Sequence, residues 1–386
     1  MIPQEAIERN AVPVPADHVQ PGLVTQAQLV RLHGQNILFS ASQRAIFALS
    51  ETAADIWLAL QEGAPPESIP RRILRGRLGP VSAKEHVRAA LDEWERLGLI
   101  RPPAPSISTC PDNRLSQTLA VAGRAIRIVY PAAHAFPAIT VFSHLEVQQE
   151  KANTLFELVD HGDRIHLFRD GEWLRTCVPE EIATVLKGEL LAEALKHGTY
   201  ELALHAAALS RSERLVLLCG DPGAGKTTLT LALAHAGFGF VSDDVTLLNA
   251  DGQGVGLPFA AAVKSGAWPL LGQHYPNLYT KPVFRRPDRK RVRYVVPKEF
   301  SLGSLSPRPI DWVLLLHRDS TSSSHLAPVD PVGALRGLLN GAFAPGRELS
   351  SSAFDVLTQV IGSARICRLT YSRLKDAVEL IEGACR

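Results

Sequence analysis

Apolar residues in the first hundred positions recur at two different spacings. Leu29–Leu32 and Asn36–Phe39 stand on either side of His33-Gly34, a pattern that predicts a β-hairpin with a tight turn. After residue 50 the apolar positions recur every three or four residues, as they do on the buried face of a helix. We therefore expect two helices, one from about Glu51 with Ser50 as its N-cap and one from Ser82 to Leu97 closed by Gly98.

The pattern becomes strand-rich from about residue 115 to residue 178 and then alternates between helices and strands. A turn within Phe168–Trp173 separates two of the strands expected in the first of these regions. The strands expected later cover 202–209, 214–219, 238–242, 245–248, 312–317 and 365–369, and the helices cover 179–197, 226–235, 331–339, 353–361 and 372–381. Strands that alternate with helices around a glycine-rich turn indicate an α/β core.

A proline-rich stretch, Arg101–Pro105, interrupts the pattern after the first helices. Consecutive prolines lack backbone donors and favour an extended chain, so this stretch is typical of a linker. We expect three parts: an N-terminal α+β domain at 1–105, a strand-rich middle segment at 106–200 that packs on the third part, and an α/β domain at 201–386. A length of 386 residues agrees with two or three domains.

Composition is that of a globular protein and argues against several functions. Hydrophobic residues make up 46% of the chain and the formal net charge is +2, so no global preference for nucleic acid or a membrane surface is expected. The apolar runs are far shorter than the roughly 18 residues of a membrane helix, and the first residues show no signal-peptide pattern. Five dispersed cysteines fit reduced thiols, which favours the cytoplasm.

The segment Gly220–Thr227, GDPGAGKT, carries the strongest chemical signal. It fits the pattern G-x4-G-K-[ST] between an apolar strand and a helix, where backbone N–H groups and the helix N-terminus can hold phosphate. Lys226 is expected to reach the β- and γ-phosphates of ATP, and the Thr227 hydroxyl to bind Mg²⁺. The expected nucleotide-binding residues are Gly220, Asp221, Pro222, Gly223, Ala224, Gly225, Lys226, Thr227 and Thr228. A glycine-rich turn without a ligand is the alternative.

Two adjacent acids, Asp243 and Asp244, follow the strand that comes after this helix. Carboxylates at a strand end beside a phosphate loop can hold Mg²⁺ or accept a proton from an attacking hydroxyl. Neighbouring residues of a strand point to opposite faces, so we expect the pair to divide these two roles. Asp243 joins Thr227 as an expected metal ligand, while the base is either acid. A solvated Asp-Asp turn is the alternative interpretation.

Positive charge is concentrated in one later segment. Lys281–Arg293 holds seven basic side chains against one acid, Asp288. Its Arg285, Arg286 and Arg293 can stabilise charge on a transferring phosphoryl group or receive an acidic peptide, although a solvated basic loop explains them equally well. Lys264, shortly before this segment, is a further candidate for a substrate or nucleotide contact and is equally well explained as a surface lysine.

The stretch around the loop resembles the core of the HPr kinase/phosphorylase family. The resemblance rests on LHAAA at Leu204–Ala208, the loop itself and the following helix and strand up to Asp243-Asp244, and it covers about residues 202–248 well. It implies a P-loop kinase fold in which His205 lies near the attacked phosphate and one of the two acids is the catalytic base. The Glu-x-Arg-Gly element of the family has no counterpart after Asp244, and Thr227 replaces the usual serine. These departures leave the phosphorylase reaction open.

Residues 23–100 resemble the PqqD-like peptide-recognition domain. The resemblance rests on the hairpin, on LSETAADIWLAL and on VRAALDEWERLGLI, and a generic winged-helix-like domain is the alternative. Domains of this kind occur in peptide-modifying systems and bind a leader peptide that adds a strand to an exposed sheet edge. A tethered leader-binding module would raise the local concentration of the rest of the substrate.

The two resemblances together imply a kinase of ribosomally made precursor peptides, including those of lasso-peptide pathways. Such a kinase would use ATP and Mg²⁺ to phosphorylate a serine or threonine hydroxyl of a peptide bound through its leader. A nucleotide-gated peptide-binding ATPase and a small-molecule kinase are the alternatives. The HPr kinase resemblance also implies a homo-oligomer, although no interface is visible in the sequence. No nucleic acid or membrane partner is expected.

Overall fold

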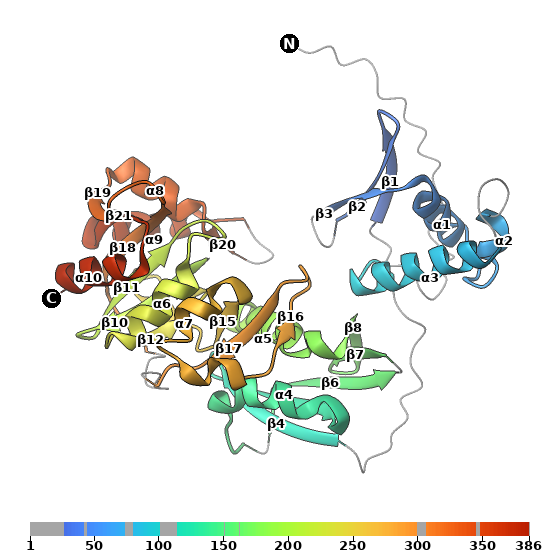
Figure 1. Cartoon of the computed structure of the whole chain (residues 1–386), viewed down its shortest axis with the longest axis horizontal. Helices are drawn as coiled ribbons and strands as arrows, with labels where there is room; N and C mark the ends of the chain where they lie inside the picture. The colour runs from blue at the N-terminus through green and yellow to red at the C-terminus, as the bar shows by residue number, and fades with distance from the viewer. Residues whose placement is uncertain are drawn as a thin grey trace. The chain divides into compact units, whose positions relative to one another are not determined.

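The computed structural model describes residues 27–41, 45–73, 80–100, 114–149, 151–161, 163–298, 306–344 and 348–385 (Figure 1). The chain forms two compact units, one chiefly of Met1–Thr109 and the other chiefly of Cys110–Ile165 and Cys177–Arg386. The linker expected at residues 101–105 lies outside the described residues, so the proposed domain boundaries remain predictions. Among the described residues no helix is long and apolar enough to cross a membrane.

The first unit is a small antiparallel sheet followed by helices. Its strands are β1 (Ala27–Leu32), β2 (Gln35–Ser40) and β3 (Ala45–Leu49), in that order in the sheet, and its helices are α1 (Glu51–Gln61), α2 (Ile69–Ile73) and α3 (Pro80–Arg96). The hairpin is confirmed, because Leu32 pairs with Gln35 and the two turn residues have positive φ. The Ser50 hydroxyl caps α1 as expected. Strand β3 and helix α2 were not expected.

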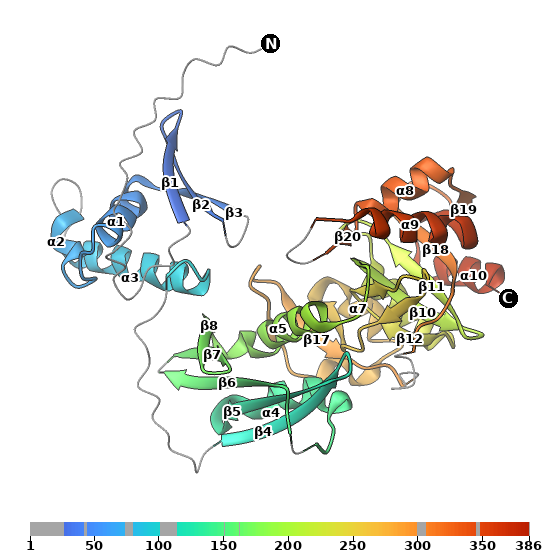
Figure 2. The same ribbon diagram turned by 180° about the vertical axis from the view of Figure 1, so that it is seen from behind.

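The next part of the chain is a five-stranded sheet flanked by two helices. The strands are β4 (Arg114–Val121), β5 (Arg124–Pro131), β6 (Thr154–His161), β7 (Arg164–Arg169) and β8 (Glu172–Cys177), in that order in the sheet. The helices are α4 (Ala132–Phe142) and α5 (Ile182–His197), with short 3-10 turns at Ser143–Leu145 and Pro179–Glu181. Helix α4 lies along the sheet (Figure 2) and was not expected, because Pro137 stands inside it and no side chain caps its start.

The last part holds the central sheet, whose strand order is β12-β10-β11-β18-β21-β19. Its strands are β10 (Ala206–Arg211), β11 (Arg214–Cys219), β12 (Gly239–Ser242), β18 (Ile310–Arg318), β19 (His325–Pro328) and β21 (Arg365–Tyr371). Its helices are α6 (Lys226–His235), α7 (Trp268–Leu271), α8 (Pro331–Leu339), α9 (Ser351–Ser363) and α10 (Leu374–Ala384), with 3-10 turns at Ser265–Ala267 and Pro276–Thr280. The expected α/β core is thereby confirmed.

Two smaller sheets accompany the central one. The first has the order β14-β13-β9-β20 and consists of Gly254–Gly256, Thr246–Leu248, Leu202–Leu204 and Ala342–Phe343. The second has the order β15-β17-β16 and consists of Ala261–Lys264, Arg291–Val295 and Phe284–Arg285. The single strand expected at 202–209 is therefore wrong: it breaks at His205, with β9 in a smaller sheet and β10 in the central sheet.

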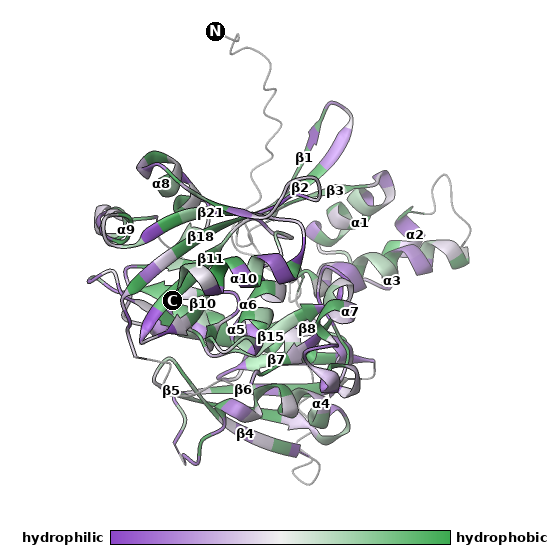
Figure 3. Ribbon diagram, turned by 60° about the vertical axis from the view of Figure 1, so that its left-hand side comes forward, coloured by the Kyte–Doolittle hydropathy of each residue, from purple (hydrophilic) through white to green (hydrophobic). Residues whose placement is uncertain are grey.

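Alternating side chains of β11 explain why the central sheet is covered on both faces. Val216 and Leu218 join one buried cluster with α6, α7 and α10, whereas Leu215 and Leu217 join another with α8 and α9. A strand buried on both sides has a continuous apolar run, as 215–219 does. Figure 3 shows the sheet between these two helical layers.

Candidate functional site

The expected site residues meet at one edge of the central sheet because of how its strands run. Strand β11 is parallel to β18, and β18 is parallel to β21. Strand β12 runs the same way as β11, since both are antiparallel to β10. The carboxyl ends of these four strands therefore lie at one edge, and so does the start of β10. Ligands of open α/β sheets bind outside the carboxyl ends of the strands.

Register places the individual side chains at this edge. Ala206 pairs with Cys219, so His205 just before β10 lies beside Gly220 just after β11. Ala208 pairs with Ser242, which places the acidic pair just after β12 close to both. Segments distant in sequence are thus brought together by strand pairing alone.

The phosphate loop adopts backbone conformations that glycine permits and other residues rarely adopt. Gly223 and Gly225 have φ of 101° and 93°, in the left-handed region that favours glycine. A Cβ at Gly223 would meet no atom within 4 Å, whereas a Cβ at Gly225 would collide with the Tyr371 hydroxyl. Position 225 therefore needs glycine for two reasons, conformation and space. Helix α6 begins directly afterwards at Lys226.

Tyr371 supports the loop from the end of β21. Its hydroxyl donates a hydrogen bond of 2.7 Å to the carbonyl oxygen of Ala224. Burial raises the pKa of the Tyr371 hydroxyl, so it remains a donor at neutral pH. The sequence pattern did not single out this residue. Its position at the carboxyl end of a strand parallel to β11 would have placed it at the edge where ligands of such sheets bind.

Lys226 is held within the loop. Its ammonium group donates a hydrogen bond of 2.5 Å to the carbonyl oxygen of Gly220, and the residue is 8% exposed. Burial lowers the pKa of Lys226, and the nearby Asp244 and Asp243 act in the opposite direction. A cation placed in this way can move to an anionic ligand once one enters the loop.

Asp243 is a buried carboxylate with one oxygen unpaired. It is 4% exposed, its Oδ2 accepts a hydrogen bond of 3.0 Å from the Ala262 amide, and its Oδ1 has no hydrogen-bond partner among the described residues. Burial raises its pKa, while Lys187 and the nearby Thr227 hydroxyl oppose that shift. An unpaired buried carboxylate oxygen beside a threonine hydroxyl fits a hard cation such as Mg²⁺.

Lys187 is a contributor that the sequence pattern missed. It belongs to α5, in the segment before the central sheet, and its ammonium group lies 3.4 Å from the carbonyl oxygen of Ala260. Its charge is the largest influence that favours the ionised form of Asp243. The helix that precedes the core therefore takes part in the electrostatics of the site.

Asp244 has a different environment from its neighbour. Its side chain is 48% exposed, and its Oδ1 lies 3.3 Å from Nδ1 of His205. Burial lowers the pKa of His205, so the ring is mainly neutral at pH 7. The two acids thus have unequal environments, and both lie just beyond the end of β12 rather than within the strand, while the division of roles between them stays a prediction.

Lys226, Tyr371, His205 and Asp244 line one cavity of about 720 Å³, whereas Asp243 and Lys187 are not among its lining residues. Of the nine residues expected to bind nucleotide, seven line it: Asp221, Pro222, Gly223, Gly225, Lys226, Thr227 and Thr228. Its other polar lining residues are His205, Asp244, Lys264, Arg286, Arg318, Tyr371, Ser372 and Arg373. Five cationic side chains against two carboxylates make this a cavity suited to a polyanion. Arg318 and Arg373 were not expected from the sequence.

Two of the arginines expected near substrate have other contacts. Arg285 pairs with the buried Glu181, with Nε 3.2 Å from Oε1. Arg293 donates a hydrogen bond of 2.9 Å to the Leu278 carbonyl and lies 4.4 Å from the centre of the Trp268 ring. Neither lines the cavity, whereas Arg286 and Lys264 do. Of the basic segment, then, only Arg286 reaches this site.

Comparison with known proteins gives two structural similarities. Neither a protein-family model nor a curated protein sequence matches the chain. The structure titled TbiB1 in complex with the TbiA(beta) leader peptide aligns over 21% of this chain and 96% of its own, at 19% identity and a TM-score of 0.20. The Hpr(Ser) kinase/phosphatase from Coxiella burnetii aligns over 47% of this chain and 90% of its own, at 14% identity and a TM-score of 0.23. The first of these structures was determined with a leader peptide, and the second is a kinase/phosphatase.

Proposed function

We propose that this chain is an ATP-dependent kinase that transfers the γ-phosphoryl group to a serine or threonine hydroxyl of a precursor peptide. The observation that carries the proposal is the convergence of the phosphate loop, Asp244 and His205 around a cationic cavity, with buried Asp243 next to Asp244 at the same sheet edge. A phosphate loop alone is equally compatible with a transporter or a switch protein. The addition of a carboxylate and a histidine in reach of each other supports chemistry on a hydroxyl acceptor.

The roles of the two acids follow from their surroundings. Buried Asp243, together with Thr227, would hold Mg²⁺, which when bound supplies positive charge to the β- and γ-phosphates. Asp244 lines the cavity and is half-exposed, so it can reach an incoming hydroxyl. We therefore assign the general base to Asp244. Neutral His205, donating from Nδ1, would orient its carboxylate.

The reaction follows from this arrangement. Asp244 takes the proton of the peptide hydroxyl while the hydroxyl oxygen forms a bond to the γ-phosphorus. The bond between the γ-phosphorus and the oxygen that bridges it to the β-phosphate breaks, and ADP leaves. Lys226 and Lys264, both in the cavity lining, stabilise the charge that develops on the transferring group. The backbone N–H groups of the loop keep the phosphates in place.

The first unit supports a peptide as the acceptor. Its three-stranded sheet, as described, ends in β3, where Ile46 is 70% exposed. An outer strand with an exposed apolar side chain can accept a peptide as a further strand, with main-chain hydrogen bonds for affinity and side-chain contacts for selection. We propose that the leader of the precursor peptide binds along β3. The kinase site then acts on the part of the peptide that follows the leader.

Intact mass of a candidate precursor peptide, incubated with the protein, ATP and Mg²⁺, tests the proposal. We expect a gain of the mass of one or more phosphoryl groups, which Lys226→Ala abolishes. Lys196→Ala, at an exposed position of α5, is the matched control and should leave the gain unchanged. Conversion of ATP to ADP without any gain in peptide mass would favour an ATPase instead.

A further inference from the structure

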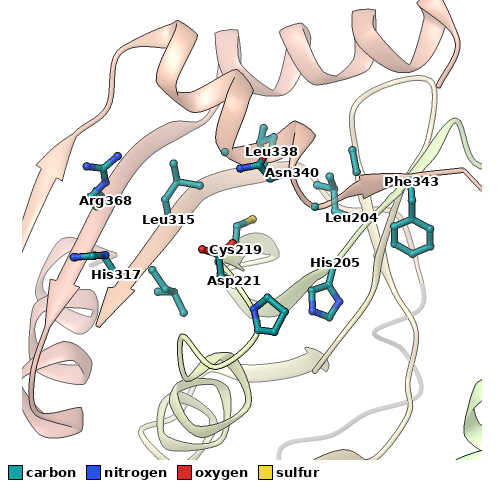
Figure 4. A pocket seen from close by; sticks show the side chains of 16 residues that line it. Leu204, His205, Cys219, Asp221, Leu315, His317, Leu338, Asn340, Phe343 and Arg368 are labelled. Carbon is teal, nitrogen blue, oxygen red and sulfur yellow. The ribbon is translucent and has the colours of Figure 1, made fainter. Parts of the chain in front are cut away.

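A second cavity, of about 580 Å³, opens beside the start of the phosphate loop (Figure 4). It shares His205, Asp221 and Pro222 with the nucleotide cavity. Lys226, Thr227 and Thr228 line only the larger cavity. The Lys226 ammonium group and the Thr227 hydroxyl, which hold phosphate and metal in the proposed mechanism, are therefore absent from the lining of the second cavity, although the start of the loop lines both spaces and they meet at His205.

The walls of this second cavity are mostly apolar. Leu204 and Leu338 are almost fully buried beneath it, while Phe343 and Leu315 are only partly buried and can contact a ligand. His205 is the polar side chain beside Phe343, while Figure 4 shows His317 and Arg368 at the opposite end of the cavity and Asn340 between the two ends. Such a surface accepts an apolar group with a few polar contacts around it.

Hydrogen bonds fix the apolar end of the cavity relative to His205. Strand β20 pairs with β9, with Ala342 opposite Leu204 and Phe343 opposite Ala203. The His205 amide also donates a hydrogen bond of 2.7 Å to the Gly341 carbonyl. Phe343 therefore stands at a set position from the His205–Asp244 pair. A group that packs on Phe343 would be held close to the reacting centre.

We propose that this second cavity is the acceptor cavity, which binds the residue next to the phosphorylated serine or threonine through an apolar side chain. The proposal rests on the function proposed above and adds a selection rule to it. A peptide with leucine or phenylalanine beside its hydroxyl residue fits the surface of Phe343 and Leu315, and a peptide with aspartate there does not. The leader unit then selects the molecule, and this cavity selects the residue within it.

The nucleotide base is the rival occupant, and the larger cavity already offers it a place. That cavity extends past the loop to Leu270 and Leu374, so it provides an aliphatic surface near the phosphates. An ATP molecule can then lie wholly within the larger cavity. The acceptor cavity remains for the second reactant, which enters near His205.

The test uses the full-length protein with ATP, Mg²⁺ and a set of hexapeptides that differ only in the residue beside a single serine. We expect leucine and phenylalanine peptides to be phosphorylated about tenfold more efficiently than the aspartate peptide, because burial of such a side chain supplies the difference. In Phe343→Ala this preference should largely disappear through a higher KM for the leucine peptide, while the KM for ATP stays unchanged. Phe354→Ala, an exposed phenylalanine of α9 outside the cavity lining, is the control.

Two outcomes would overturn the inference: an unchanged peptide preference in Phe343→Ala, or a rise in the KM for ATP instead of the KM for peptide. The hexapeptides carry no leader, so if none is phosphorylated even by the unaltered protein, the mass assay on the whole precursor peptide decides the proposed function and the cavity is tested by binding. Fluorescence anisotropy of labelled leucine and aspartate hexapeptides, with a non-hydrolysable ATP analogue present, then gives the result. Tighter binding of the leucine peptide that depends on Phe343 supports the cavity, and equal binding of both peptides contradicts it.

Discussion

The hydroxyl of Tyr371 donates a hydrogen bond to the carbonyl oxygen of Ala224 over a distance of 2.7 Å. The two residues are 147 positions apart in sequence, and the bond joins the end of β21 to the middle of the phosphate loop. The same hydroxyl occupies the space that a side chain at Gly225 would require. The loop therefore owes part of its shape to the last strand of the central sheet.

Removal of this hydroxyl should weaken nucleotide binding. We expect Tyr371→Phe to raise the KM for ATP about fivefold, because a hydrogen bond of this kind contributes about 1 kcal/mol. Tyr275→Phe is the matched control, since its hydroxyl donates a 2.8 Å bond to the Leu231 carbonyl in α6, away from the nucleotide cavity. A KM for ATP that rises equally in both variants would mean that Tyr371 acts only through general stability.

The ionised side chain of Asp243 should lower the stability of the metal-free protein at neutral pH. Because burial holds its pKa above that of an unfolded aspartate, its ionisation opposes folding. That cost is absent below the unfolded value of about 3.9 and grows as the pH rises through the folded-state pKa. Asp243→Asn should therefore have a higher Tm than the unaltered protein at pH 8 in the presence of EDTA, with the difference vanishing near pH 4. An equal or lower Tm at pH 8 would refute this account.

Lys187 should stabilise the protein only while Asp243 is ionised. A double-mutant cycle of Lys187→Met and Asp243→Asn, measured at pH 8 without metal, should show a coupling of about 1 kcal/mol. The same cycle with Lys196→Met in place of Lys187→Met should show almost none, since Lys196 is an exposed residue near the end of α5. Equal coupling for both lysines would contradict a specific interaction between Lys187 and Asp243.

Binding of the leader should depend on the outer strand β3. We expect Ile46→Lys to raise the Kd for a labelled leader peptide about tenfold, which corresponds to about 1.4 kcal/mol. The change removes an exposed apolar contact and adds a charge, and charged side chains on an outer strand discourage the addition of another strand. Leu32→Lys, at a 54% exposed position of β1, the strand at the opposite edge of the sheet, is the control. A larger effect at Leu32 would move the leader to β1.

The elements that carry the phosphate loop were predictable because the signals are local. A fully apolar run, a glycine-rich turn and the next helix are contiguous, and the helix expected at 226–235 has the bounds of α6. The break at His205 was not predictable, because its apolar flanks read as one strand and only pairing with β13 and β11 separates them. Helix α4 was also missed, because Pro137 within it argues against a helix. Packing against β4 and β5 stabilises the helix despite this proline.

The site was predictable only as far as its residues belong to recognisable motifs. The Asp243-Asp244 pair and His205 stand near the loop in sequence, and in the structure they lie at the same edge of the central sheet as the loop. Tyr371 and Lys187 come from distant segments, so their places depend on strand order and helix packing. Arg285 was a candidate because of its basic neighbourhood, and in the structure it pairs with buried Glu181 and does not line the cavity.

We expect the chain to transfer phosphate to a peptide rather than to water. The most direct measurement is a time course that counts phosphopeptide by intact mass and ADP by chromatography in one reaction with a precursor peptide. We expect one phosphoryl group on peptide for each ADP formed, and Asp244→Asn should slow both about a hundredfold or more because it removes the proposed base. ADP that forms without phosphopeptide, at a rate that the peptide does not change, would contradict the account.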